Sequence, residues 1–115
     1  MSTEAARLDK IISDYIEAIK QQGIKIEKYY LFGSHARGTA DENSDIDLIV
    51  ISSDFSQMPD WERWEILGKA VAKIMEPIEP LAFTPKEIET CIQRESNFIR
   101  HILNQPDTKL VQLSV

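Results

Sequence analysis

Two aspartates at the start of an apolar stretch point most directly to chemistry in this sequence. Asp45 and Asp47 are separated by one residue, and the run from Leu48 to Ile51 that follows them is entirely apolar. On a β-strand, side chains two residues apart lie on the same face, with Cα atoms about 6–7 Å apart. Two carboxylates at that separation repel each other unless one takes a proton or a cation lies between them. The pair therefore predicts a Mg²⁺ site, because Mg²⁺ prefers oxygen ligands and binds through one or two carboxylates together with substrate phosphates.

A glycine-serine pair upstream of the aspartates has the composition of a phosphate-binding turn. Gly33 and Ser34 follow an apolar segment and begin a short predicted helix over residues 34–37. Backbone N–H groups at the start of a helix bind anions, and glycine lets the backbone approach them closely. The serine hydroxyl is a further donor, and Arg37 adds a positive charge. The predicted nucleotide-binding set is Gly33, Ser34, Arg37 and Ser44.

Each of these residues also has a purely structural explanation. Asp45 could cap a turn, Asp47 could be an exposed carboxylate at a sheet edge, and a Gly-Ser pair is most often only a turn. The combination favours the functional explanation: a Gly-Ser turn and an Arg-Gly precede Ser-Asp-x-Asp at the start of an apolar strand. One part of this pattern can bind phosphate, and the other can bind the metal that bridges phosphates.

The stretch GSHARGTADENSDIDLIVI, residues 33–51, resembles the signature of the polymerase-beta-type nucleotidyltransferases, in which Gly-Ser is followed by Asp-x-Asp. It is most similar to the minimal nucleotidyltransferases, small prokaryotic proteins with little beyond the catalytic core. The resemblance implies that Gly33 and Ser34 contact the triphosphate of ATP, and that Asp45 and Asp47 hold two Mg²⁺ ions. It also implies a third carboxylate on a later strand that points at the same metals.

Glu79 is the candidate for this third carboxylate. It lies on a predicted strand, six residues before the helix start at Pro85, where similar proteins often carry an aspartate. A glutamate at this position departs from the family pattern. Glu76 is the alternative ligand. Without a metal, Glu79 would simply be a solvated residue at the edge of the sheet. The predicted catalytic and metal-binding set is therefore Asp45, Asp47 and Glu79.

The resemblance also implies a partner and a reaction. Minimal nucleotidyltransferases are typically paired with a helical HEPN-domain ribonuclease toxin, on which they adenylylate a tyrosine and so act as antitoxins, in a hetero-oligomer or homodimer. Two other functions are compatible with the residues: an antitoxin that neutralises its partner by binding alone, and a transferase for a small molecule such as an aminoglycoside. Intact Ser34, Asp45 and Asp47 favour catalysis, whereas glutamate at position 79 leaves the binding function open.

Helices and strands alternate in the segments that must position these residues. Apolar residues recur at helical spacing from Leu8 to Ile19, which predicts a first helix that ends at Gly23. The same spacing predicts a helix over residues 60–75, with Trp61 and Trp64 in the core or at its edge, on one side with Leu67 or Gly68, Val71 and Ile74. Further helical segments are expected from Pro85 past Ile92 and up to Leu103.

Four strands are expected, over residues 26–32, 46–52, 77–83 and 109–115. The second is apolar throughout, which predicts a central strand covered on both faces. The third contains Pro80 and should lie at an edge, because proline cannot donate a ladder hydrogen bond. The order predicts an α/β fold of the polymerase-beta-like nucleotidyltransferase type, with helices packed on a small mixed sheet, as one domain over residues 1–115.

Composition narrows the class of protein further. The 115 residues carry 13 Lys and Arg against 19 Asp and Glu, a net charge of −6, which argues against broad binding to nucleic acid. Cys91 is the single cysteine, so an internal disulfide is excluded. The lack of disulfides is typical of proteins in the reducing cytoplasm. The sequence has no apolar run long enough to span a membrane, and its start lacks the pattern of a signal peptide. We therefore expect a cytoplasmic protein without membrane contact.

Overall fold

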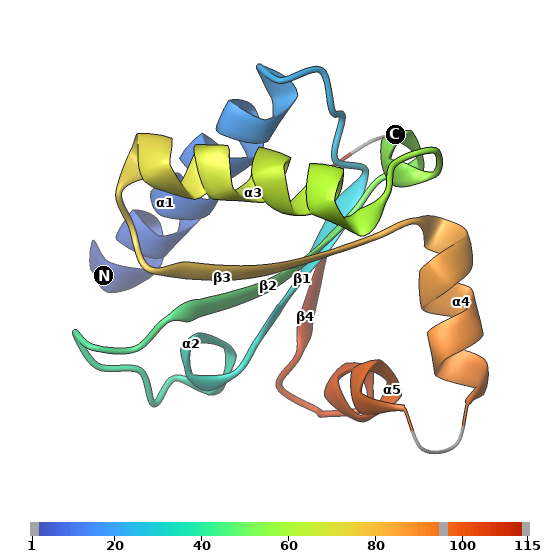
Figure 1. The fold of residues 1–115 in the computed structure, drawn as a ribbon. Coiled ribbons are helices and arrows are strands. Elements are labelled where there is room, and N and C mark those ends of the chain that lie inside the picture. Colours follow the sequence, from blue (N-terminus) through green and yellow to red (C-terminus); the bar gives the residue numbers. More distant parts are fainter. Residues whose placement is uncertain (1–2, 95–96, 114–115) are drawn as a thin grey trace.

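The structure of the protein is a computed structural model that describes residues 3–94 and 97–113. Its elements follow the expected order, with one additional 3₁₀ turn (Figure 1). They are α1 (Thr3–Lys20), β1 (Lys28–Phe32), α2 (Ser34–Arg37), β2 (Ile46–Ile51), η1 (Ser53–Phe55), α3 (Asp60–Ile74), β3 (Ile78–Phe83), α4 (Pro85–Gln93), α5 (Phe98–Leu103) and β4 (Lys109–Gln112). Within the described residues, no helix combines the length and the apolar character needed to cross a bilayer.

The four strands form one mixed sheet in the order β3-β2-β1-β4. β1 runs antiparallel to β2 and β4, and β2 runs parallel to β3. The predicted mixed sheet, the central position of β2 and the edge position of the strand that contains Pro80 are thus confirmed. β1 begins two residues later than expected, and the strand predicted over 109–115 is shorter, with residues 114–115 outside the described part.

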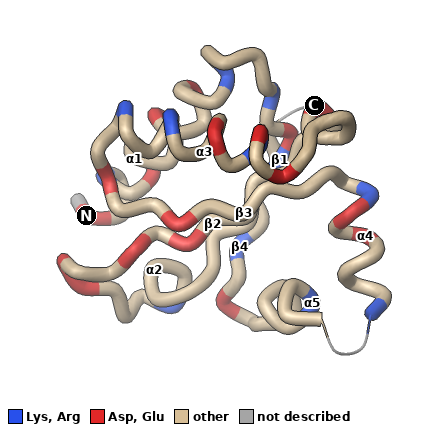
Figure 2. The backbone as a smooth tube through the Cα atoms, in the orientation of Figure 1, with Lys and Arg blue, Asp and Glu red and all other residues tan. Residues whose placement is uncertain are grey.

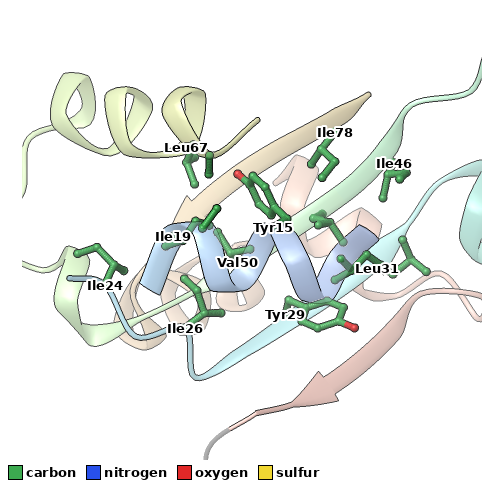
Figure 3. Close-up of a cluster of buried hydrophobic side chains, with 14 of the residues drawn as sticks. Tyr15, Ile19, Ile24, Ile26, Tyr29, Leu31, Ile46, Val50, Leu67 and Ile78 are labelled. Atoms are coloured by element: carbon green, nitrogen blue, oxygen red, sulfur yellow. The ribbon is translucent and has the colours of Figure 1, made fainter. Parts of the chain in front are cut away.

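Helices cover both faces of the sheet (Figure 1). One core lies between the sheet and the pair α1 and α3; Figure 3 shows Tyr15, Val50 and Leu67 meeting there. The other core lies beneath α4 and α5 and includes Ile49 and Ile51. Because strand side chains alternate between faces, Asp47 lies on the same face as Ile49 and Ile51. The catalytic candidates therefore belong to the α4 and α5 side of the sheet.

The expected core positions of the two tryptophans are wrong. Trp61 is 67% exposed and Trp64 is 56% exposed. The buried residues of α3 are instead Arg63, Leu67 and Ala70. Leu67, Val71 and Ile74, which were expected on the same side as the tryptophans, do lie in or against the core. The helical spacing alone therefore does not decide which positions of the first turns face inward. The helix consequently presents large apolar side chains on its outer side.

A partly buried ion pair joins α3 to the start of α4. Nη1 of Arg63 lies 2.7 Å from Oε1 of Glu87, and Nη2 donates to the carbonyl of Phe55 at 2.8 Å. Glu87 also completes a capping box with Thr84, whose hydroxyl accepts the Glu87 N–H. Arg63 and Glu87 therefore fix where the chain leaves β3 and where α4 begins.

Candidate active site

The turn that follows β1 begins at Gly33, in a backbone conformation that only glycine adopts readily. Its φ of 75° and ψ of −155° lie outside the regions open to residues with a Cβ atom. A Cβ placed on Gly33 would also collide with Oδ2 of Asp47. The backbone of the predicted phosphate-binding turn therefore lies directly against the predicted metal-binding carboxylate, and both constraints require glycine.

The short helix α2 completes this turn. The Gly33 carbonyl accepts the N–H groups of Ala36 and Arg37, both at 3.1 Å, and Gly38 ends the helix in the left-handed conformation. No side chain of the described residues caps its first turn. The first N–H groups of α2 are thus available to an anion at the place where the sequence predicts one.

Three carboxylates gather at one end of the sheet. Asp47 on β2 and Glu79 on β3 are partners in the parallel register, and neighbouring strands lie about 4.8 Å apart. Asp45 precedes β2, two residues before Asp47, and continues the same alternation. Figure 2 shows a group of acidic residues where β2 and β3 begin. The structure thus brings together all three residues of the predicted catalytic set.

The carboxylates strongly affect one another. Burial, a hydrogen bond with Glu79 and the negative charges of Glu79 and Asp45 raise the pKa of Asp47 to about 6, whereas the nearby His35 opposes the shift. The Asp47 carboxyl therefore keeps its proton to a higher pH than an isolated aspartate, because its anion would be buried beside other negative charge. In the described part of the chain, no three acidic, histidine or cysteine side chains are already arranged around a cation position. The oxygen donors and their mutual repulsion nevertheless fit Mg²⁺, which would remove that repulsion.

Ser44 and His35 stabilise the segment that leads into β2. Nε2 of His35 lies 3.4 Å from the Ser44 carbonyl oxygen, which holds α2 against this segment. The Ser44 hydroxyl accepts the Asp41 N–H at 3.0 Å and closes a turn. The Ser44 hydroxyl is engaged in this turn, so its predicted contact with the nucleotide stays a prediction.

A cavity of about 260 Å³ opens beside the Gly33 turn, between α2 and α5. Gly33 and Arg37 line it on one side, as expected of nucleotide-binding residues, and Phe98 and His101 line it on the other. Phe98 is 66% exposed. The sequence did not identify Phe98 or His101 as site residues, because an aromatic and a histidine three positions apart on a short helix are equally typical of packing or of a surface. The cavity extends the candidate site from the carboxylates to α5.

Comparisons with known proteins agree with this geometry. The family model described as nucleotidyltransferase domain matches residues 12–103. The protein adenylyltransferase MntA of Shewanella oneidensis is 34% identical over 59 residues, which are 51% of this chain and 41% of that protein. A candidate protein adenylyltransferase of Methanocaldococcus jannaschii is 46% identical over 46 residues, 39% of this chain and 31% of that protein. The matches thus span less than half the length of these two relatives.

A solved structure of a candidate nucleotidyltransferase from Sulfolobus solfataricus superimposes with a TM-score of 0.62. The superposition covers 91% of this chain and 79% of that one, at 19% sequence identity. At this identity the likeness concerns the fold. It includes nearly the whole chain, and so extends beyond the 33–51 signature to the sheet and the helices on both of its faces.

Proposed function

Since this chain belongs to the nucleotidyltransferase domain family, we propose that it transfers AMP from ATP to a tyrosine hydroxyl of a helical HEPN-domain ribonuclease toxin and so acts as an antitoxin. One observation carries the catalytic part of the proposal: Asp47 lies beside Glu79 in the sheet and against the backbone of Gly33. The candidate phosphate-binding turn and the candidate cation-binding carboxylates therefore share one end of the sheet, which supports transfer from a nucleoside triphosphate.

Two observations support a protein acceptor. The relatives described above carry the name protein adenylyltransferase, or are candidates for that activity. The net charge of −6 is complementary to a basic, RNA-cleaving partner, because opposite charges steer association. We therefore place the acceptor hydroxyl on a partner protein that docks beside Glu79, at the open edge of the sheet.

The chain's own residues have distinct roles in the proposed reaction. The first N–H groups of α2 and the guanidinium of Arg37 bind the phosphates that leave as pyrophosphate. Asp45, Asp47 and Glu79 would hold two Mg²⁺ ions, which neutralise phosphate charge when bound. The bond from the acceptor oxygen to the α-phosphorus forms as the bond to pyrophosphate breaks. Glu79 is exposed next to Asp47, and we assign it as the acceptor of the hydroxyl proton.

The cavity between α2 and α5 suits the nucleoside. It begins at Gly33 and Arg37, where the phosphates are proposed to bind, and ends at the exposed ring of Phe98. A nucleobase gains about 1–3 kcal/mol by stacking on an aromatic side chain. We therefore propose that adenine lies against Phe98, with His101 beside it. This assignment gives α5 a function in addition to its packing on the sheet.

Intact-mass measurement of the helical protein encoded beside this chain tests the proposal. After incubation with this chain, Mg²⁺ and ATP, we expect a gain of one or more AMP units. The variant Asp45→Asn/Asp47→Asn should give no gain, because the carboxylates that hold Mg²⁺ are lost. Asp9→Asn/Asp14→Asn, the same change on exposed positions of α1, should behave as the wild type. A stable complex of the wild-type proteins without any mass gain would refute catalysis and leave an antitoxin that acts by binding.

A further inference from the structure

The outer face of α3 carries an apolar stripe along the whole helix. Its members within the helix are exposed and spaced three or four residues apart: Trp61, Trp64, Gly68 and Ala72. Met75, the residue that ends the helix in the left-handed conformation, extends the row. The side chains at its two ends are the most exposed, with Trp61 at 67% and Met75 at 86%. A helix of this length presents a stripe about 21 Å long. Large apolar side chains in such a row are typical of an interface.

The stripe is symmetric about Gly68. Trp64 and Ala72 lie four positions to either side of it, and Trp61 and Met75 lie seven positions to either side. A second copy of α3 that crosses antiparallel at Gly68 would set Trp64 against the partner's Ala72, a large side chain against a small one. It would also set Trp61 against the partner's Met75, a favourable contact of sulfur with an aromatic ring. Gly68 has open space around it, so the two helices can approach closely there.

The charges beside the stripe have the same symmetry. Glu62 and Glu65 flank its N-terminal half, and Lys69 and Lys73 flank its C-terminal half on the same side of the helix. Figure 2 shows this division along α3. In an antiparallel pair each acidic half meets the partner's basic half, whereas a parallel pair would set like charges together. Within one chain Lys69 contacts Glu65 at 3.2 Å, on exposed side chains that can reorient.

We infer that the outer face of α3 binds a second copy of this chain, as an antiparallel and two-fold symmetric helix pair centred on Gly68. The inference is independent of the proposed activity. α3 packs on one face of the sheet, whereas Asp47 and its neighbours lie on the face of α4 and α5. Both active sites of the dimer therefore stay open to nucleotide and to an acceptor protein.

The two tryptophans of the chain both belong to the stripe, and Trp64 also lines a hollow beside β3, so intrinsic fluorescence reports on this side of α3. We expect sedimentation velocity to show a concentration-dependent dimer of the purified chain. The tryptophan emission maximum should shift to shorter wavelength as the dimer forms and the indole rings leave water. Trp64→Glu should give a monomer with unchanged circular dichroism, because Trp64 lies outside both cores.

A charge exchange tests the antiparallel arrangement itself. Glu62→Lys/Glu65→Lys makes the flank entirely basic, and Lys69→Glu/Lys73→Glu makes it entirely acidic. Each variant alone should dimerise at least about tenfold more weakly than the wild type, since like charges then face each other. An equimolar mixture of the two should recover a heterodimer. Glu17→Lys/Glu89→Lys, the same charge change on exposed positions of α1 and α4, should dimerise as the wild type.

Three results would overturn the inference. The first is a wild-type chain that stays monomeric at all accessible concentrations. The second is a dimer that the charge exchange and Trp64→Glu leave intact, because its interface then lies elsewhere. The third is a shift of the tryptophan emission only after a different protein is added, because the stripe is then a contact with that protein.

Discussion

Charged side chains meet the sheet in two regions of this molecule, and their arrangements are opposite. At the start of β2 and β3, Asp47 lies beside Glu79 with Asp45 close by. Burial, a hydrogen bond with Glu79 and these like charges raise the pKa of Asp47 to about 6. At the other ends of the same strands, Arg63 meets Glu87. Burial alone would raise the pKa of Glu87, but hydrogen bonds from Arg63 and Thr84 lower it below its ordinary value.

The difference separates a region arranged for function from one arranged for stability. The carboxylate cluster is unfavourable for the folded chain until a cation binds, and such arrangements are typical of active sites. Arg63 instead has carboxylate and carbonyl partners, and its guanidinium lies 5.7 Å from the ring of Phe55. A change in the first region should therefore alter activity more than stability, and a change in the second should do the reverse.

Glu79→Gln should produce the largest effect. We expect the rate of AMP transfer to fall about 10²–10³-fold, the usual loss when one preorganised electrostatic group is removed. Without Mg²⁺ the thermal midpoint should rise, because Asp47 loses a negatively charged neighbour. The measurements are initial rates with ATP and Mg²⁺, and thermal unfolding with EDTA.

Glu76→Gln is the matched control for this variant. Glu76 pairs with Arg7 at 3.8 Å and lies outside the carboxylate cluster. The Glu76→Gln variant should therefore transfer AMP at the wild-type rate. An unchanged rate in Glu79→Gln together with a large loss in Glu76→Gln would assign the third carboxylate to Glu76 instead.

Arg63→Ala should show the reverse pattern. Removal of one partner of a buried ion pair costs about 3–5 kcal/mol, and we expect about 3 kcal/mol because Glu87 is partly open to solvent. Urea unfolding measures this loss. Nucleotide binding per folded molecule should stay near the wild-type value.

Lys10→Ala breaks an exposed pair, in which Nζ of Lys10 lies 2.9 Å from Asp14, and should cost less than about 0.5 kcal/mol. A similarly small cost for Arg63→Ala would mean that the buried pair does not stabilise the junction of α3 and α4.

The sequence predicted the fold well because its strongest local signals agree with one another. The apolar run from Leu48 to Ile51 became the buried central strand, Pro80 lies on an edge strand, and the Thr84-Pro85 pair starts α4. The predicted family is confirmed by the model that matches residues 12–103. The structure places Glu79 beside Asp47 in the register of β2 and β3, with Asp45 two residues before Asp47, and their role as metal ligands stays a prediction.

What the sequence could not predict depends on contacts between distant segments. The inward face of α3 includes Arg63, a charged residue that is buried only because Glu87, 24 positions later, reaches it. The expected inward face is confirmed at Leu67, Val71 and Ile74 and is wrong at Trp61 and Trp64, which are exposed. Phe98 became a candidate only when the fold placed α5 opposite the Gly33 turn. Periodicity identifies a helix, but its orientation follows from tertiary packing.

The pH dependence of stability without Mg²⁺ should have opposite sign in the two regions. The pKa of Asp47 is raised from 3.8, so its proton stabilises the fold below that value, and the contribution is lost as pH rises through about 6. The pKa of Glu87 is lowered from 4.5, so its contribution is present above that value and is lost as pH falls through the lowered pKa.

Urea unfolding with EDTA measures this dependence. The free energy of unfolding of Asp47→Asn should exceed that of the wild type by about 1 kcal/mol at about pH 8, after allowance for solvent screening, and by little near pH 4. Added Mg²⁺ should stabilise the wild type and reverse this order at pH 8, because the cation binds the ionised carboxylates. An Asp47→Asn variant that is less stable than the wild type at pH 8 in EDTA would show that these carboxylates do not oppose folding, and the contrast between the two regions would fail.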